Sequence, residues 1–135
     1  MAVLQQLTYA ECLRRLDTAG VGRVAVTEHA LPAIVPVNFV CTGEHILFRT
    51  EPGGMLAHGC DGTVVAFEID GIDPSGTAGW SVLVVGTAEL VPDGSTGSPT
   101  DLEIVSAIRG DRGQLVAISL SQVSGREVKA DGKAA

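Results

Sequence analysis

The sequence predicts a mainly β fold, a small closed or partly closed antiparallel barrel with helices packed on its outside. Three observations support this prediction. The 135 residues are 45% hydrophobic but only 4% aromatic, and the many Val residues favour strands because their branched side chains pack well on a pleated surface. About six strand-like segments are joined by short turns at nearly regular spacing. Strands do not alternate with long helices, which disfavours a doubly wound parallel sheet.

The strands are predicted from their apolar patterns. The segment 63–70 alternates, with Val65, Phe67 and Ile69 on one face. The segment 80–91 is almost continuously apolar, and we therefore expect it to be covered on both faces. Short loops between the early segments predict an antiparallel meander. The expected strands are residues 23–27, 33–40, 45–50, 63–70, 80–91 and 115–120, the last of them resuming around Val123.

Two capping boxes predict helices. The Thr8 hydroxyl can accept an N–H of the first helical turn, and Glu11 can reach back to the Thr8 amide, so a helix is expected over residues 8–19. A second box at residues 100–103 opens another helix. This second helix is expected over residues 100–108, and a short helical turn, ended by Gly59, is expected separately at 55–58.

Composition and charge exclude several classes of partner. The formal net charge is −7 and the isoelectric point is about 4.7, so nucleic acid and anionic lipid repel the chain, and we expect neither as a partner. Cys12, Cys41 and Cys60 have no disulfide or metal spacing, which fits a reducing compartment. The N-terminus does not resemble a leader, and no apolar run approaches the ~20 residues that a membrane helix needs. We therefore expect a cytoplasmic protein.

The chain is predicted to form a single domain over residues 1–125. A chain of this length can bury one core but not two. Residues 126–135 are polar and rich in small side chains, and we expect them to form a flexible C-terminal tail.

Pro36 lies inside the predicted second strand, in the run Val35-Pro36-Val37-Asn38. Because proline has no N–H to donate to a ladder, this strand is locally at an edge, at a bulge, or beside something other than a partner strand. An ordinary edge strand and a strand that carries a flat ligand both satisfy the pattern. The amide of Asn38 could bond a ligand ring or satisfy the backbone.

A Gly-rich segment follows the third strand, over residues 48–56. The strand ends in Arg49 and Thr50, and Gly53 and Gly54 lead into the short helical turn. A guanidinium, a hydroxyl and free backbone N–H groups can together hold a phosphate. The alternative is a loop that merely turns the chain.

Few residues suggest catalysis. Trp80, the single tryptophan, opens a strand, and it either packs in the core or lies beside a planar ligand or a second subunit. His29, His45 and His58 have no metal-binding spacing, and no serine lies in a hydrolase motif. The sequence indicates no general acid or base, and no metal site is expected.

Four stretches of the chain share a pattern with other proteins, in order and spacing, across residues 7–91. The stretches are Gly22-Arg23-Val24-Ala25-Val26; Pro32 with Ile34-Val35-Pro36-Val37-Asn38-Phe39; Ile46-Leu47-Phe48-Arg49-Thr50 with Pro52-Gly53; and Val65-Ala66-Phe67-Glu68-Ile69-Asp70 with Ile72-Asp73 and Gly79-Trp80-Ser81-Val82-Leu83-Val84. On these residues the chain resembles the pyridoxamine 5′-phosphate oxidase-like, flavin-nucleotide-binding family. The region after Pro92 matches only in outline.

The resemblance implies a six-stranded antiparallel split β-barrel of the FMN-binding type. It also implies a homodimer with a cofactor, FMN, in each of two grooves between subunits. The FMN ring would lie along the backbone of Val35, Pro36, Val37 and Asn38. By the same resemblance the other cofactor-binding residues are Phe48, Arg49, Thr50, Gly53, Gly54, Met55 and Leu56 on the phosphate side, and Trp80 and Ser81 near the subunit interface.

One position departs from the family pattern. Family members usually carry Lys or Arg at the position of Met55, where it pairs with the cofactor phosphate, and methionine offers no charge. Losing such a charge-assisted hydrogen bond costs about 1.5–3 kcal/mol, or about tenfold or more in affinity. FMN binding is therefore expected to be weakened, with Arg49, and Arg23 if it faces the groove, left to neutralise the phosphate.

The resemblance thus predicts an FMN-binding protein and an FMN-dependent oxidoreductase with a small-molecule substrate, in which the cofactor supplies the redox chemistry. Oxidation of pyridoxamine phosphate itself is not predicted, because no arginine cluster for a substrate phosphate is found. Two alternatives stay open. A deazaflavin coenzyme or haem replaces FMN, or the protein is a cofactor-free dimer with a binding or structural role.

Overall fold

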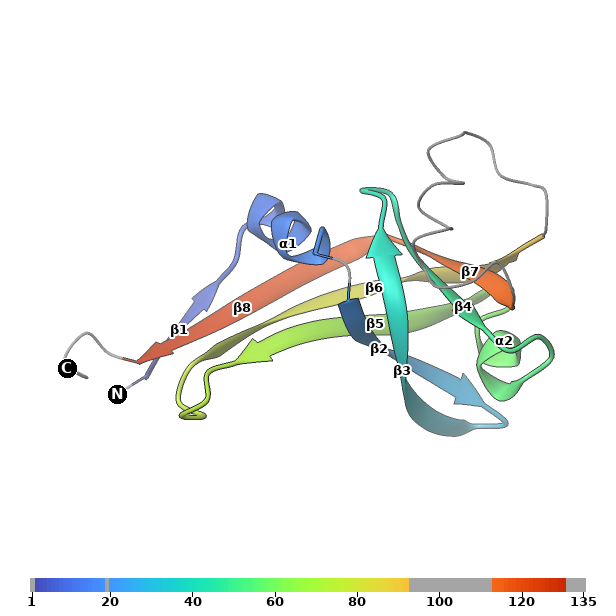
Figure 1. Cartoon of the computed structure of the whole chain (residues 1–135), viewed down its shortest axis with the longest axis horizontal. Helices are drawn as coiled ribbons and strands as arrows, with labels where there is room; N and C mark the ends of the chain where they lie inside the picture. The colour runs from blue at the N-terminus through green and yellow to red at the C-terminus, as the bar shows by residue number, and fades with distance from the viewer. Residues whose placement is uncertain (1, 19, 93–112, 131–135) are drawn as a thin grey trace.

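The computed structural model describes residues 2–18, 20–92 and 113–130, and this part of the chain forms eight strands and two helices (Figure 1). The strands are β1 (Ala2–Gln6), β2 (Gly20–Glu28), β3 (Leu31–Cys41), β4 (His45–Thr50), β5 (Thr63–Ile72), β6 (Gly79–Val91), β7 (Gln114–Ser119) and β8 (Gln122–Ala130). The helices are α1 (Tyr9–Leu16) and α2 (Met55–Gly59).

Six of these strands close into an antiparallel barrel, which confirms the predicted fold class. Neighbouring strands follow the order β6, β5, β2, β3, β4 and β7, and β7 pairs back with β6. β6 has two partners along one edge: Gly79–Val85 pair with β8, and Ala88–Val91 pair with β7. β8 and β1 therefore continue the sheet beyond the barrel, as the long arm at the left of Figure 1 shows.

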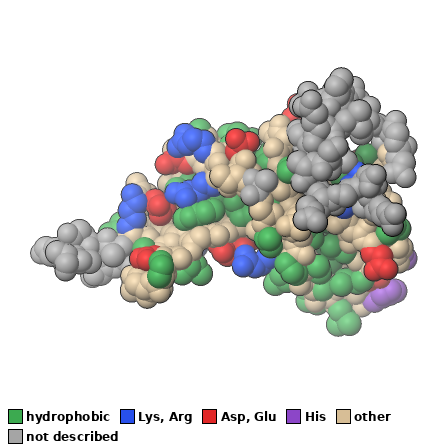
Figure 2. All heavy atoms as spheres, in the orientation of Figure 1, with side chains coloured by type: hydrophobic (Ala, Val, Ile, Leu, Met, Phe, Trp, Pro, Cys, Tyr) green, Lys and Arg blue, Asp and Glu red, His purple; other side chains and the backbone are tan. Residues whose placement is uncertain are grey.

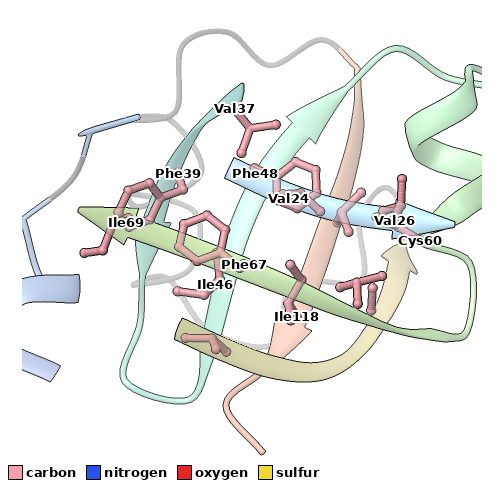
Figure 3. Packing of buried hydrophobic residues seen from close by; sticks show 14 of the residues in the cluster. Val24, Val26, Val37, Phe39, Ile46, Phe48, Cys60, Phe67, Ile69 and Ile118 are labelled. Carbon is pink, nitrogen blue, oxygen red and sulfur yellow. The ribbon is translucent and has the colours of Figure 1, made fainter. Parts of the chain in front are cut away.

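Alternate residues of the strands fill the interior of the barrel. Val24, Phe67 and Ile118 are buried there, and Figure 3 shows them among the labelled side chains that converge between the strands. Phe39 packs edge-on against Phe67, with ring centroids 4.8 Å apart. Gly22 leaves room for the Phe67 ring, because a Cβ at position 22 would collide with it. The predicted apolar faces of β2 and β5 thus meet in the main core.

Helix α1 begins at the predicted capping box. The Thr8 hydroxyl accepts a hydrogen bond from the Glu11 amide at 3.1 Å, and the Glu11 carboxylate accepts one from the Thr8 amide at 2.8 Å. The bond from the Thr8 backbone is the main reason why the pKa of Glu11 is lowered. Cys12 and Leu16 are buried, and α1 packs on β8 and β6. The helix therefore covers one side of the sheet where β6 and β8 pair.

The C-terminal end differs from the expectation. Residues 126–130, which were expected to begin a flexible tail, form the last part of β8 and pair with β1. Arg126 also pairs with Ser81 of β6. These residues are mostly polar, and backbone pairing orders them without an apolar pattern: all five pair with β1, and Arg126, Glu127 and Val128 also pair with β6. β1, a short edge strand, was not expected either, and residues 131–135 lie outside the described chain.

Two other expectations concern β6 and the segment that follows it. β6 is not covered on both faces, because the buried Val82, Val84 and Ala88 alternate with exposed residues such as Leu83. The long apolar run therefore combines a core face with a second apolar face that is open on this chain. The helix expected at 100–108 lies outside the described residues. No helix in the described ranges is long and apolar enough to cross a membrane.

Candidate functional site

β3 and β4 are paired only over a short length, and we call the place where these two strands part the opening of the barrel. In the described chain these strands share three residue pairs, and the last of them joins Phe39 to Phe48. Beyond this pair β3 continues along β2, whereas β4 continues along β7. Asn38 and Arg49 are the first residues past the last pair. They therefore stand on the two sides of the opening.

The opening leaves one edge of β3 without a strand partner. Leu31–Asn38 pair with β2 on one side, and no described strand pairs with them on the other. Pro36 lies in this stretch, opposite Arg23 of β2. The interpretation that Pro36 marks a strand edge is confirmed, and its missing N–H is no loss where no second strand follows.

The guanidinium of Arg49 uses some of its N–H donors within the described chain and leaves another without a partner there. One terminal nitrogen, Nη1, donates to the carbonyl oxygen of Gly113 at 2.9 Å. Its Nε is buried and has no hydrogen-bond partner among the residues that the structure describes. A buried N–H without a partner costs free energy, so such an atom suits a position that a ligand acceptor fills. A phosphate oxygen is an acceptor of this kind.

The chain turns sharply after β4 and enters α2. Gly53 has a φ of +72°, a conformation that favours glycine, and an added Cβ there would meet no atom within 4 Å. Met55 begins α2 and is 46% exposed. Gly59 lets α2 pack closely on β2, because an added Cβ at position 59 would lie only 3.0 Å from Cβ of Val26. The turn is therefore open at Gly53, and the side chain that α2 presents there carries no charge.

The outer face of the barrel carries a row of residues that crosses four strands. Pro36 on β3, Arg23 on β2, Glu68 on β5 and Leu83 on β6 lie opposite one another in register. The face around this row is largely apolar. Its exposed apolar residues are Val21, Ile34, Val64 and Leu83.

Arg23 is the charged centre of this face. Its Nη1 lies 3.1 Å from Oε1 of Glu68 and 3.1 Å from Oδ2 of Asp70, so two carboxylates share one guanidinium. Partial burial, and then the neighbouring Asp70, raise the pKa of Glu68, while Arg23 opposes the shift. Arg23 is therefore committed to these carboxylates and does not bring a free charge to the opening.

A hollow of about 360 Å³ lies at one end of the outer face, where β5, β6 and β8 run side by side. Its floor includes a polar row, in which Asp70, Ser81 and Arg126 lie in register on the three strands. The loop between β5 and β6 contributes to its rim. An apolar row lies beside the polar one and consists of Ile72, Gly79 and Val128.

Trp80 points to the opposite face of β6 from Ser81. The guanidinium carbon of Arg15 on α1 lies 4.4 Å from the centroid of the indole. Gly71 lies under the ring, since a Cβ there would come within 2.6 Å of the indole nitrogen. Arg15 also forms an ion pair with Glu127 of β8 at 3.3 Å. The indole therefore packs between α1 and the sheet, and this structural role explains the position of Trp80.

The structure divides the residues expected to bind the cofactor into two groups. One group surrounds the opening between β3 and β4, and the other lies on β6 beside the hollow. β2 and β5 lie between β3 and β6, so three strand spacings along the sheet, about 14 Å, separate the β3 residues from Trp80 and Ser81. The first group comprises Val35, Pro36, Val37, Asn38, Phe48, Arg49, Thr50, Gly53, Gly54, Met55 and Leu56, and the second comprises Trp80 and Ser81.

Not every member of the first group presents its side chain to the opening. Val37, Phe48 and Leu56 are buried in the main core. Their side chains hold β3, β4 and α2 in place, whereas Pro36 and Asn38 are exposed. The opening is thus bordered by backbone, by Arg49 and by the Gly-rich turn.

Sequence reasoning missed the charged residues of the outer face. Glu68 and Asp70 alternate with the buried residues of β5, a pattern that already places them on the face away from the core. Arg126 had no such signal, because β8 has no regular apolar alternation. Its place beside Ser81 depends on strand pairing alone.

The histidines and cysteines do not converge. His29 lies in the tight turn of the β2–β3 hairpin, where its φ of 52° and the φ of 64° at Ala30 suit a two-residue turn. Burial raises the pKa of Cys60 to about 11 and also raises that of Cys12, so both thiols are protonated at neutral pH. Among the described residues, no group of three or more His, Cys, Asp and Glu side chains could hold a metal ion.

Comparison with known sequences agrees with this fold. The family model of pyridoxamine 5′-phosphate oxidase matches residues 8–127. An uncharacterized protein of Mycobacterium tuberculosis is 39% identical over 93 residues. That match covers 65% of this chain and 61% of the length of the mycobacterial protein.

Solved structures are similar over nearly the whole chain. The FAD-binding protein of Mycobacterium smegmatis is 30% identical with a TM-score of 0.72, and the similarity covers 93% of this chain and 98% of that one. An FAD-binding protein from Mesorhizobium loti has a TM-score of 0.80 over 96% of this chain and 100% of that one, and at 22% identity it supports the fold alone. Because the family model extends from the start of α1 into β8, the chain belongs to the pyridoxamine 5′-phosphate oxidase family.

Proposed function

We propose that this protein binds a flavin nucleotide, with the flavin ring along the free edge of β3 and the phosphate toward Arg49. One observation carries the proposal: a strand edge without a partner lies beside a buried guanidinium N–H that also lacks one among the described residues. A flavin ring has N–H and carbonyl groups that a strand edge can bond, and a phosphate accepts from Arg49. The family, and the FAD bound by the M. smegmatis protein, support the same class of ligand.

The opening suits FAD better than FMN, the cofactor that the sequence led us to expect. Arg49 is the cation that the described residues bring to the opening, since Met55 is neutral and Arg23 is engaged with two carboxylates. A phosphate monoester such as that of FMN carries about −1.5 to −2 charges at neutral pH. Each of the two phosphates of FAD carries a single negative charge, so Arg49 can balance the one that lies beside it, and the other requires a second cation elsewhere.

The outer face supports a second proposal, a homodimer. Exposed apolar side chains gather on β2, β3, β5 and β6, and Figure 2 shows hydrophobic side chains over the β2–β3 hairpin at the lower right. Contiguous apolar surface of this kind on a folded domain marks an interaction site. A twofold contact uses the same patch on both protomers.

A twofold axis near Arg23 and Glu68 would also complete the candidate site. The β3 opening and the hollow on β5, β6 and β8 lie on opposite sides of the β2–β5 pair. Rotation about an axis between them sets the opening of one protomer against the hollow of the other. Ser81 would then approach the flavin from the second protomer, as the family resemblance implies.

The activity that follows from this arrangement is that of an oxidoreductase acting on a small molecule. The flavin, when bound, supplies the redox chemistry. The residues of this chain bind and orient it: the free edge of β3 holds the ring, Arg49 holds the phosphate side, and the apolar outer face keeps water from the contact between protomers. The location that fits this role, the cytoplasm, is part of the same proposal.

Flavin titration tests the proposal. The absorption spectrum of the purified protein is recorded first, and then FMN, FAD and a deazaflavin coenzyme are each titrated while flavin fluorescence is followed. The expected result is bound flavin, or saturable quenching in which FAD binds more tightly than FMN. A folded protein that binds neither flavin would overturn the proposal, and binding of the deazaflavin alone would replace it with that alternative.

A further inference from the structure

We infer that the hollow formed by β5, β6 and β8 is a subsite for the adenosine monophosphate end of FAD, with Arg126 as the residue that holds its phosphate. The inference rests on the proposed function and extends it to a second surface. The hollow lies three strands away from the β3 opening on the same face. The proposed dimer brings it next to the opening of the second protomer.

Arg126 is a cation that lines this hollow. It is exposed on β8 opposite Ser81, and no ion pair or hydrogen bond joins its side chain to another residue in the described ranges. Arg23, on the same face, is engaged in ion pairs with Glu68 and Asp70. In a chain with a net charge of −7, an arginine that forms no ion pair with the described carboxylates suits an anionic ligand, because its planar donors match phosphate oxygens.

The same floor offers acceptors for a sugar. Asp70 and Glu68 each give Arg23 one oxygen, and because an ionised carboxylate has about four acceptor sites, capacity remains for a ligand. An Asp or Glu holds the ribose hydroxyls in dinucleotide-binding folds in this way. The hydroxyl of Ser81 stands in register between Asp70 and Arg126, and it can donate to a phosphate or accept from a ribose.

The apolar row of the hollow offers a surface for the purine base, the third part of the ligand. Ile72 is 72% exposed, and it lies in register with Gly79 and, through it, with Val128. Gly79 has no side chain to fill the space between them. A purine base could pack on these side chains, and the hollow's volume of about 360 Å³ lies within the roughly 300–1,000 Å³ typical of ligand pockets.

The charges of the hollow are balanced rather than acidic. Glu68 and Asp70 both pair with Arg23, and Arg126 adds a second positive charge to the lining, so the two carboxylates do not leave an unopposed negative field over a phosphate. The order of groups along the floor therefore matches a nucleotide: a cation for phosphate, carboxylates for ribose and an apolar wall for the base. FMN lacks the adenosine monophosphate part, so this surface would discriminate between the two flavins.

The test compares Arg126→Gln with wild type on riboflavin, FMN and FAD. Loss of a charge-assisted hydrogen bond should weaken FAD binding about tenfold, while FMN and riboflavin binding stay unchanged. Arg14→Gln is the matched control, since it removes the same charge from an exposed position on α1 outside the hollow. It should leave all three affinities as they are.

A second measurement uses AMP alone as the probe. AMP should compete with FAD, raising its apparent Kd, and should not compete with FMN. In Arg126→Gln this competition should be lost. Circular dichroism of both variants establishes that they remain folded.

Each other outcome overturns the inference in a distinguishable way. If Arg126→Gln weakens FMN and FAD equally, Arg126 holds the flavin's own phosphate and the adenosine subsite is wrong. If it weakens neither, the hollow is not part of the site, although flavin binding by wild type still supports the proposed function. If wild type binds no flavin, the proposed function fails and the inference fails with it.

Discussion

Phe39 and Phe48 form the last residue pair between β3 and β4, and the barrel opens directly beyond them. Both side chains are buried in the main core. The closed side of the opening is therefore anchored by packing, whereas the edge of β3 beyond it stays free. A ligand at this edge meets backbone groups whose position the core determines.

Replacement of Gly22 by alanine should destabilise the fold. The added Cβ would collide with the Phe67 ring, which is fully buried and packs against Phe39. Overpacking of this kind costs about 1–3 kcal/mol. The free energy of unfolding, measured by urea denaturation, should fall by that amount.

Gly20→Ala is the matched control for this variant. Gly20 lies on the same strand, and an added Cβ there meets nothing within 4 Å. Its free energy of unfolding should therefore stay within about 1 kcal/mol of wild type. Equal losses for the two variants would show that strand glycines as such, and not the Phe67 contact, set the stability.

Glu68→Gln should stabilise the protein increasingly as the pH rises. Because the pKa of Glu68 is raised in the folded state, mainly by burial, the folded chain binds this proton more tightly than the unfolded chain does. The stability that Glu68 contributes is therefore complete below its ordinary pKa of 4.5. It is lost as the pH rises through the raised value.

Urea unfolding of wild type and Glu68→Gln over a series of pH values checks this prediction. Glutamine does not titrate, so the stability of the variant relative to wild type should grow with pH across that window and then level off. A difference that is constant with pH would mean that burial beside Asp70 does not perturb Glu68.

Met55→Lys should tighten FMN binding about tenfold or more, because it restores a charge-assisted hydrogen bond to the phosphate. Riboflavin, which has no phosphate, should bind as it does to wild type. Tyr9→Lys adds the same charge at an exposed position on α1 and serves as the control. Fluorescence titration provides the affinities, and no gain for FMN would mean that the phosphate lies elsewhere.

Leu83→Lys should convert the proposed dimer into a monomer. Leu83 is 41% exposed on the outer face and lies opposite Glu68, so a lysine there is tolerated on the isolated chain. In an apolar contact between protomers the same charge would be buried at high cost. Light scattering should report a monomer for this variant and a dimer for wild type and Tyr9→Lys.

The barrel follows from the sequence where one strand face is buried. Val24 and Val26 on β2, and the alternating residues of β5, are apolar because they face the core, so their strands can be recognised locally. Pro36 is informative for a similar reason, since its missing N–H is a property of the residue itself. The strand edge that it predicts is present.

The sequence does not predict those parts of the structure that depend on pairing between distant segments. β8 and β1 are ordered by backbone hydrogen bonds and not by an apolar pattern. The sequence therefore predicted a tail at Arg126, whereas the structure pairs this residue with Ser81. The separation of the candidate site into two groups follows from the strand order of the sheet. A local pattern cannot encode that order, because it is set by which strands meet in space.

The central claim is that a flavin nucleotide binds at the β3 opening and that a second protomer completes the site. The most direct test is a flavin-fluorescence titration of wild type and Leu83→Lys in parallel, with light scattering on the same samples. The account predicts saturable binding of one flavin per chain to the wild-type dimer, and much weaker binding to a folded Leu83→Lys monomer. Binding of equal strength to the monomer, or a wild-type dimer that binds no flavin, would contradict it.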